Sequence, residues 1–259
     1  MGMSKGQGDT QSDVPASKVC KRNRERERER ERPSASTFYL QMDIKSFFTS
    51  IDHQILYDLV AKRVKNEEIL WLTRAIIFHD CAHDVPPKIQ SQPSLFAKLP
   101  KDKSLFTVQH GKGLPIGNLT SQFFANVYMN QLDQFAKHTL KAKYYLRYVD
   151  DFLIIERDKN KLKEFQNIIS QFTKDNLALT VHPDKQFIRA VDSGIDFVGY
   201  VVKPDHVLVR KRVVGNWRWS LKKSSDAEEI QQTHNSYCAH AIWANTFWLR
   251  EKMAKIAIV

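Results

Sequence analysis

The sequence predicts an α+β protein in which helices cover one face of an antiparallel sheet of the split βαβ type. Three observations lead to this class. A strand-like run at 38–42 precedes two segments with helical spacing, two further strand-like runs flank a pair of acids, and short strand-like runs follow before a basic tail. The resulting order of strand, helix, helix, hairpin, helix and strands suits helices packed on one side of such a sheet.

The first strand and the two helices after it have clear local signals. Strand formers at 38–42 run directly into Asp43. Ser50 and Asp52 can cap one helix, and a second is expected after Asn66. Apolar residues then recur at helical spacing: Ile55, Leu56, Leu59 and Val60 in the first helix, and Ile69, Leu70, Leu72, Ile76 and Ile77 in the second. Prolines break residues 80–112 into an irregular excursion.

The second half of the chain is expected to return to the sheet. After a flexible loop at 111–117, a long helix starts near Leu119, with apolar positions at Phe123, Phe124, Val127, Tyr128, Leu132 and Phe135. Strands at 144–149 and 152–155 enclose Asp150 and Asp151 in a hairpin turn. We then expect a helix at 160–174, strands at 177–181, 185–189, 195–202 and 206–210, and a helical tail.

Charge and composition point to a globular protein with a polyanionic partner. The chain has 259 residues, of which 42% are hydrophobic, and its net charge is +11. A positive surface field favours nucleic acid, although a basic protein without a specific partner is the alternative. Residues 1–37 lack the apolar positions that burial requires, and we expect them to form a disordered, low-complexity segment.

Cysteine usage and hydropathy predict a cytoplasmic protein without membrane contact. Cys20, Cys81 and Cys238 are too widely separated for a disulfide framework. No apolar run approaches the roughly 20 residues that span a bilayer, and the N-terminus lacks the apolar core of a signal peptide. His79, Cys81 and His83 have no fourth ligand at a suitable spacing, so we do not expect zinc.

Three carboxylates carry the sharpest chemical signal. Asp43 ends the first strand, and Asp150 and Asp151 lie in the turn of a hairpin that neighbours this strand in a split βαβ sheet. Carboxylates that meet repel one another unless cations neutralise them, and hard oxygen ligands select Mg²⁺ or Mn²⁺. A pair of such ions promotes in-line displacement at phosphorus. An ordinary acidic turn is the alternative.

Five segments in order resemble the motifs of reverse transcriptases. These are FYLQMDIKSFFTSID at 38–52 (motif A), GLPIGNLTSQ at 113–122 (motif B), YVDD at 148–151 (motif C), HPDKQFI at 182–188 (motif D) and GIDFVGYVV at 194–202 (motif E, the primer grip). The resemblance covers about 38–258. It implies a right-hand polymerase whose palm, a ferredoxin-like split βαβ sheet, occupies 38–203, with a partial fingers-like insertion at about 66–112 and a small helical thumb at 204–259.

The resemblance also implies catalytic roles. Asp43, Asp150 and Asp151 would hold two Mg²⁺ ions, for which Mn²⁺ can substitute, and Ile44 would add its backbone carbonyl as a ligand. Lys185 would protonate the pyrophosphate leaving group. A solvated surface lysine is the alternative for Lys185.

Further residues would shape the nucleotide site. Phe48 would close against the sugar 2′ position and select deoxynucleotides, unless it is a core aromatic beside Phe47. Gly117 would let the backbone approach the nascent base pair, and Gln122 would face the template. Relatives such as the retroviral enzymes carry Gln where this chain has Ile116, so nucleotide selection would be relaxed.

The implied function is that of an RNA-directed DNA polymerase, a nucleotidyltransferase that extends a DNA or RNA primer on an RNA template with dNTPs. GLPIGNLTSQ is similar to motif B of diversity-generating retroelement enzymes, which copy RNA with errors at adenines and could use an accessory protein. In the tail, Arg210, Lys211 and Arg212 suit phosphate contacts, while Trp217 and Trp219 could pack or stack on bases. Two alternatives stay open: a non-catalytic nucleic-acid-binding relative and an antiphage defence reverse transcriptase.

The resemblance departs from the family pattern before Phe38. Relatives carry a fingers region there, whereas the 37 residues of this chain lack its strand pattern. We therefore expect the fingers to be largely absent, as in a fragment, a truncated or frameshifted gene, or a chain that a partner completes. The upstream half of the nucleotide pocket would then be missing from this chain.

Overall fold

The structure is a computed structural model that describes residues 37–80, 100, 104–223 and 226–257. All of these residues belong to one compact unit, Ala35–Val259. Among these residues no helix is both long enough and apolar enough to cross a bilayer. The predicted disordered segment at 1–37 lies outside the described residues except for Thr37.

Four antiparallel strands form the main sheet, in the order β2-β3-β1-β4. Their bounds are Phe38–Met42 (β1), Tyr144–Tyr148 (β2), Asp151–Glu156 (β3) and Phe187–Ala190 (β4). Met42 pairs with Phe152, so the end of β1 lies beside the start of β3. Strand β2 lies at one edge of the sheet and alternates between half-buried and exposed side chains.

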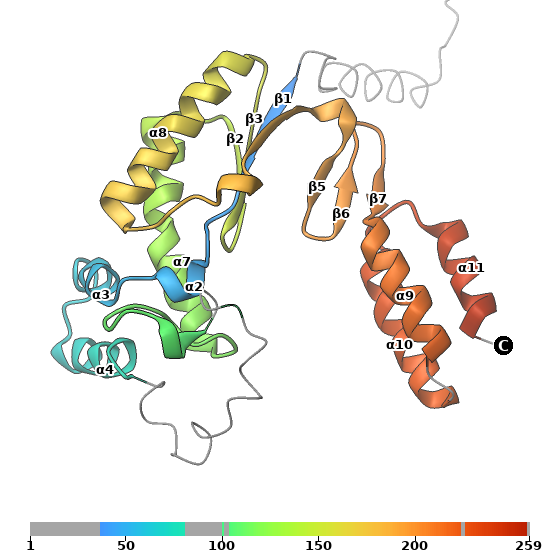
Figure 1. Ribbon diagram of the computed structural model, residues 1–259, viewed down its shortest axis with the longest axis horizontal. Coiled ribbons are helices and arrows are strands. Elements are labelled where there is room, and N and C mark those ends of the chain that lie inside the picture. Colours follow the sequence, from blue (N-terminus) through green and yellow to red (C-terminus); the bar gives the residue numbers. More distant parts are fainter. Residues whose placement is uncertain (1–36, 81–99, 101–103, 224–225, 258–259) are drawn as a thin grey trace, which may run out of the picture. The chain divides into compact units, whose positions relative to one another are not determined.

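Helices α7 (Leu119–Gln134) and α8 (Lys159–Leu177) cover one face of this sheet (Figure 1). Leu40 and Met42 of β1 point into that core, because alternate residues of a strand face the same side. The predicted α+β class, with helices on one face of an antiparallel sheet, is confirmed.

The opposite face of the sheet packs against a second, three-stranded sheet of order β5-β6-β7. Its strands are Ile195–Phe197 (β5), Tyr200–Val202 (β6) and Val207–Val209 (β7). Tyr39 of β1 packs with Leu153, Ile195 and Phe197, and its hydroxyl donates to the Gly194 carbonyl over 3.2 Å. Along β1, Tyr39 thus faces the second sheet, while Leu40 and Met42 face the main core.

Three helices follow β1: α2 (Phe47–Ser50), α3 (His53–Ala61) and α4 (Glu67–Ile77). The caps predicted at Asp52 and Asn66 are confirmed, since Asp52 accepts hydrogen bonds from the amides of Gln54 and Ile55 and Asn66 accepts one from Ile69. Ser50, the other expected cap, is instead the last residue of α2. The helix expected after Asn66 is present, and of its apolar residues Ile77 is buried whereas Ile69 and Leu72 are 51% and 52% exposed. Helical spacing shows which residues share a face, but not whether another element covers it.

The structure corrects several expected elements further along the chain. Helix α8 continues to Leu177 and ends at Ala178, which adopts a left-handed conformation, so the predicted strand at 177–181 is reduced to one bridge between Val181 and Ile44. The predicted strand at 195–202 is two strands joined through Val198 and Gly199, both at positive φ. Phe123 was expected on the buried stripe of α7, but it is 62% exposed.

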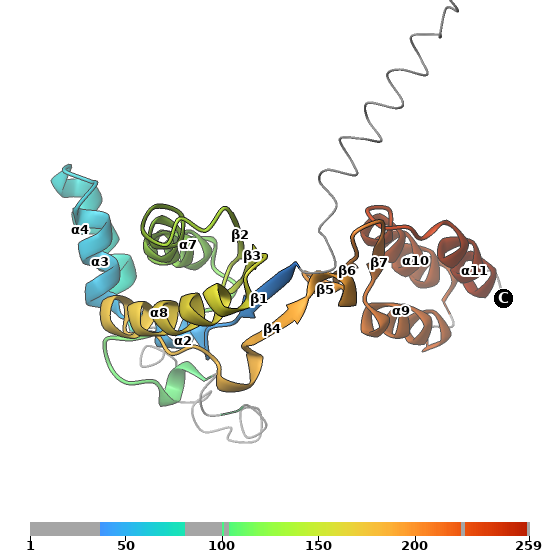
Figure 2. The ribbon, with the colours of Figure 1, turned by 90° about the horizontal axis from the view of Figure 1, so that it is seen from above.

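The predicted helical tail is confirmed as α9 (Lys211–Lys223), α10 (Ala227–Ala241) and α11 (Phe247–Ala257). Figure 2 shows the three helices side by side. They pack around Trp217, Leu221 and Met253, and Trp217 stacks on Tyr237. Short turns elsewhere are η2 (Leu105–Thr107), the π-helical η3 (Phe135–Thr139), η4 (Pro183–Lys185) and η5 (Val191–Ser193).

Tyr128 joins three helical segments and provides a stability test. Its buried hydroxyl donates to the Leu177 carbonyl at the end of α8 over 2.6 Å and accepts from the amide of Asp52, the cap of α3, over 3.4 Å. Tyr128→Phe leaves a buried carbonyl without its donor, so we expect a loss of about 1–3 kcal/mol in the free energy of unfolding, measured by urea denaturation.

The matched control is Tyr144→Phe, because Tyr144 is 56% exposed. We expect this variant to change the free energy of unfolding by less than about 0.5 kcal/mol. Equal losses in the two variants would contradict a structural role for the Tyr128 hydroxyl.

Candidate active site

The main sheet brings together the three acids that the sequence singled out. Asp43 directly follows β1, Asp151 is the first residue of β3, and Asp150 lies in the two-residue turn between β2 and β3. The segment after β1 is held by backbone hydrogen bonds from His182 to the Asp43 carbonyl and from Lys45 to the Thr180 carbonyl, at 2.8 and 2.9 Å. Asp43 is 8% exposed.

The three carboxyl groups are close enough to perturb one another. Burial raises the pKa of Asp151 to about 6, and the negative charges of Asp43 and Asp150 and a hydrogen bond with the Asp43 carboxyl add to the rise. Burial, followed by the charge of Asp43, also raises the pKa of Asp150. The site therefore concentrates negative charge where solvent screens it poorly.

Lys185 supplies a positive charge to this group. It ends the η4 turn, and its Nζ lies 2.8 Å from Asp43 Oδ2. The hydrogen bond to Asp43 raises the pKa of Lys185, so the amine is protonated at neutral pH. More than half of the Lys185 side chain is exposed, which leaves it free to reorient.

A cavity of about 330 Å³ opens beside the acids. Phe48 and Ile116 form part of its wall, and Phe48 packs edge-on against Phe47 with ring centroids 5.4 Å apart. Ile116 is 74% exposed. Of the residues predicted for the site, those that line the cavity are Asp43, Ile44, Phe48, Ile116, Asp150 and Lys185.

Gly117 and Gln122 lie outside the lining of this cavity. Gly117 has a φ of +104°, a conformation that strains any residue with a side chain, and the space where a Cβ would lie is open. Gln122 is exposed in the first turn of α7. The structure thus places both residues near the loop that carries Ile116, without joining them to the acids.

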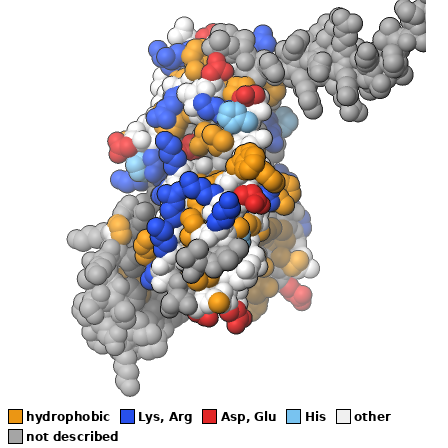
Figure 3. Space-filling model, turned by 90° about the vertical axis from the view of Figure 1, so that its right-hand side faces the viewer, with side chains coloured by type: hydrophobic (Ala, Val, Ile, Leu, Met, Phe, Trp, Pro, Cys, Tyr) orange, Lys and Arg blue, Asp and Glu red, His pale blue; other side chains and the backbone are white. Residues whose placement is uncertain are grey.

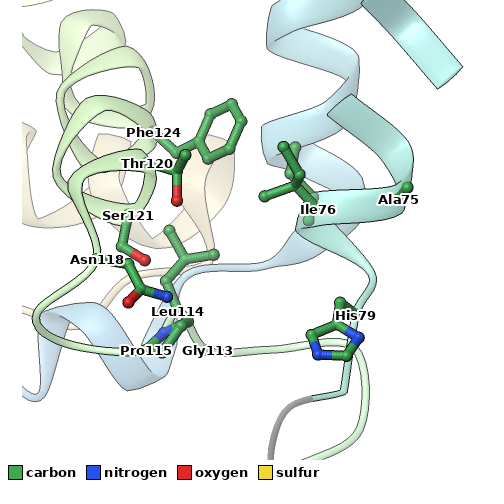
Figure 4. A pocket seen from close by; sticks show the side chains of 11 residues that line it. Ala75, Ile76, His79, Gly113, Leu114, Pro115, Asn118, Thr120, Ser121 and Phe124 are labelled. Carbon is green, nitrogen blue, oxygen red and sulfur yellow. The ribbon is translucent and has the colours of Figure 1, made fainter. Parts of the chain in front are cut away.

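A second cavity, of about 370 Å³, lies between α4 and the start of α7 and was not anticipated from the sequence. In Figure 4, Asn118 and Ser121 come from the α7 side and face Ile76 and His79 across the cavity. Ser121 and Asn118 are the signal that could have indicated it, since polar residues interrupt the apolar pattern there.

The described residues differ in how well they suit a metal ion. Within them, no group of three or more His, Cys, Asp or Glu side chains is arranged around one position that could hold a metal ion. Cys81 and His83 lie outside the described residues, so the expectation about zinc at His79 is untested there. The ammonium of Lys185 forms a salt bridge with Asp43 Oδ2. The ligand atoms that the three acids offer are carboxylate oxygens, the hard ligands that Mg²⁺ prefers.

An arginine network supports the acidic turn and was missed from the sequence. Arg147 of β2 forms a two-point salt bridge with Asp133 of α7 and donates to the carbonyl of Val149, the first residue of the turn. The available signal was a charged residue inside an otherwise apolar strand, on the same face as Tyr145.

The basic tail presents charge and aromatic surface on one face. Figure 3 shows Lys and Arg side chains gathered together with apolar ones on the side of the molecule that carries α9–α11. Trp217 is buried, whereas Trp219 is 62% exposed with the Lys223 ammonium 4.9 Å from its ring centroid. Of the two predicted roles for these tryptophans, packing therefore applies to Trp217, and Trp219 remains accessible.

Comparisons with known proteins converge on one family. The family model described as reverse transcriptase (RNA-dependent DNA polymerase) matches residues 6–202. The COX1/OXI3 intron 2 protein of Saccharomyces cerevisiae is 23% identical over 202 residues, which cover 64% of this chain and 24% of that protein. The chain thus spans about a quarter of the length of this relative.

Solved structures of telomerase from Candida tropicalis share the fold. The apo enzyme matches with a TM-score of 0.55 and 15% identity over 86% of this chain and 40% of that chain. A form truncated from the C-terminal domain matches with a TM-score of 0.50 and 15% identity over 76% of this chain and 40% of that chain. At this identity the likeness concerns the fold alone.

The raised pKa of Asp151 predicts that removing the charge of its carboxylate increases the stability of the protein, by an amount that depends on pH. In an unfolded chain an Asp titrates near about 3.9, so folding holds the proton on Asp151 up to about pH 6. Ionisation then lowers stability as pH rises through this interval. With EDTA present, we expect Asp151→Asn to raise the Tm at about pH 8 and to change it little at about pH 3, where the carboxyl is protonated in both the folded and the unfolded chain.

The matched control is Asp192→Asn at an exposed position. Thermal unfolding of this variant should show the same small change at both pH values. A Tm gain for Asp151→Asn that is equal at the two pH values would contradict repulsion among the three acids.

Proposed function

The chain belongs to the reverse transcriptase family, and from that premise we propose that it is an RNA-directed DNA polymerase. It would join dNTPs to the 3′-hydroxyl of a DNA or RNA primer on an RNA template. The observation that carries the proposal is the meeting of Asp43, Asp150 and Asp151 beside a cavity walled by Phe48 and Ile116, where burial and the charges of neighbouring acids raise the pKa values of Asp150 and Asp151.

The three carboxylates and the Ile44 carbonyl would hold two Mg²⁺ ions, or Mn²⁺ in their place. Such ions lower the pKa of a primer hydroxyl and stabilise the charge that develops in displacement at phosphorus. Two observations support this assignment. The raised pKa values mark an excess of negative charge that a cation would relieve, and the site already stabilises one cation, the Lys185 ammonium against Asp43.

Lys185 would act as the general acid of the reaction. Its ammonium carries a proton at neutral pH and lies beside the acids, at the wall of the cavity. The exposed side chain would turn from Asp43 toward the leaving pyrophosphate and donate a proton from Nζ to one of its oxygens.

Phe48 and Ile116 would shape the nucleotide. The Phe48 ring would exclude a ribose 2′-hydroxyl, which favours deoxynucleotides. Ile116 offers no hydrogen bond donor or acceptor, so it would check pairing geometry less strictly than a glutamine would. Gly117 and Gln122 would contact the nascent pair and the template, to which their exposed positions leave access.

The finer assignment is an error-prone enzyme of a diversity-generating retroelement, with an accessory protein as a further partner. Its support is the form GLPIGNLTSQ at 113–122 together with the exposed, apolar Ile116. Sequencing the products of primer extension tests it: we expect misincorporation to concentrate opposite template adenines. An even distribution of errors over the four template bases would instead favour another branch of the family, such as an antiphage defence enzyme.

We expect the purified chain to extend a primed RNA template with dNTPs and Mg²⁺, and we expect Asp150→Ala to reduce extension by at least about 1,000-fold. Extension would fall because the site would lack one of the three carboxylates that hold the metal ions. Extension is measured by gel electrophoresis of a labelled primer.

Asp192→Ala serves as the matched control, because Asp192 is exposed in η5 and does not line the cavity. It should retain wild-type extension. Failure of the wild-type chain to incorporate any nucleotide with Mg²⁺ or Mn²⁺ and with DNA or RNA primers, while it still binds the primed RNA, would favour the non-catalytic, binding-only function.

The proposed role of Phe48 predicts a change in sugar selection. Phe48→Ala removes the ring from the cavity wall, so we expect the preference for dGTP over GTP to fall by at least about tenfold in single-nucleotide incorporation. Phe247→Ala, at a position 60% exposed in α11, is the control. An unchanged preference in Phe48→Ala would remove Phe48 from the nucleotide site.

A further inference from the structure

We propose that Arg147 is a positioning residue that fixes the turn that carries Asp150 and leads into Asp151 by tying this turn to helix α7. The inference deepens the proposed function and rests on it for the assignment of the acids. Arg147 belongs to β2, directly opposite Phe152 of β3, so its side chain lies beside the hairpin end without touching the carboxylates themselves.

The guanidinium of Arg147 is almost fully used. Nε and Nη2 donate to the two carboxylate oxygens of Asp133, each over 2.7 Å. Nη1 donates to the Val149 carbonyl over 2.8 Å and to Asn126 Oδ1 over 3.2 Å. Four donor interactions in one plane are a geometry that a guanidinium provides and an ammonium cannot.

The turn that Arg147 contacts needs such support. Val149 adopts a φ of +57°, in the left-handed region that a β-branched residue normally avoids. Strain of this kind persists only where surrounding contacts hold the backbone, and it occurs preferentially at functional sites. The Arg147–Val149 hydrogen bond is a contact of the required type, because it holds the carbonyl of the strained residue itself.

The other end of the network is rigid. Asp133 and Asn126 lie on the same face of α7, seven positions apart, and Asp133 also accepts a hydrogen bond from the Tyr145 hydroxyl over 2.7 Å. The side chains of Arg147 and Asp133 are only 11% and 19% exposed, so water competes weakly for this ion pair. Helix α7 therefore serves as the anchor and the turn as the part that is held.

The arrangement attaches two parts of the site, the loop with Ile116 and the turn with Asp150, to the same helix. Helix α7 begins just after the loop that carries Ile116, and the acidic turn is attached to the same helix through Arg147. Without the guanidinium, the strained turn can relax and move Asp150 relative to Asp43, which is attached to β1 instead.

The test compares the full-length chain with Arg147→Lys, which keeps the charge but loses the fork, and with Asn126→Ala, which removes one acceptor and leaves the Asp133 pair intact. Arg63→Lys, at an exposed position, is the matched control. Two readouts are used: kcat and KM for dNTP in primer extension, and the affinity for Mn²⁺ alone, measured by electron paramagnetic resonance. Thermal unfolding of each variant sets an assay temperature at which all are folded.

We expect Arg147→Lys to lower kcat and to weaken Mn²⁺ binding by about 10- to 100-fold, as when a residue that orients a ligand is lost. KM for dNTP should change less than about threefold, because the cavity wall is intact. Asn126→Ala should shift both readouts in the same direction by a smaller factor, and Arg63→Lys should match the wild type.

Wild-type kcat and Mn²⁺ affinity in Arg147→Lys would overturn the proposal, as would a loss confined to KM. If Arg147→Lys does not fold, Asn126→Ala decides by the same two readouts. If the wild-type chain extends no primer, the proposed function fails, and Mn²⁺ affinity alone decides whether Arg147 positions the acids: weaker binding in the variants supports the proposal and equal binding refutes it.

Discussion

Antiparallel pairing of β1 with β3 is the constraint on which the site depends. The register opposes Met42 to Phe152, so the backbone leaving β1 at Asp43 meets the backbone entering β3 at Asp151. A slip by one residue would turn Leu40 and Met42 out of the core, and the helices α7 and α8 that cover them exclude such a slip energetically. The hydrophobic alternation of a five-residue strand thus determines the distance between acids that are over 100 positions apart.

The same pairing creates a local cost in stability. Burial and the charges of neighbouring acids raise the pKa values of Asp150 and Asp151, and Val149 adopts a left-handed conformation; both features oppose folding at this end of the hairpin. Contacts from outside the turn offset this cost: Lys185 from η4 pairs with Asp43, and Arg147 pairs with Asp133 on α7. The site is therefore held by side chains from elements that have no place in the three-acid motif itself.

Local signals in the sequence predicted the elements that local interactions determine. The strand before Asp43, the caps at Asp52 and Asn66, and the hairpin around Asp150 are each specified within a few residues. Sequence reasoning failed where distant contacts decide. It placed a strand at 177–181, where Leu177 instead completes α8 and Tyr128 binds its carbonyl. It buried Phe123, and it overlooked Arg147, because the partners of Arg147 on α7 lie 14 and 21 positions away.

The position of β2 at the edge of the sheet has one more consequence. Among the described strands β2, like β4, has a single neighbour, so we expect the backbone amides along its outer side to exchange faster than those of β1 and β3 in native-state hydrogen exchange. Backbone pairing alone would let the end of β2 fray together with the acids that follow it. The turn with Asp150 is instead held by the Arg147 side chain, which binds helix α7 and not another strand. The position of this turn therefore does not depend on how firmly the edge strand is paired.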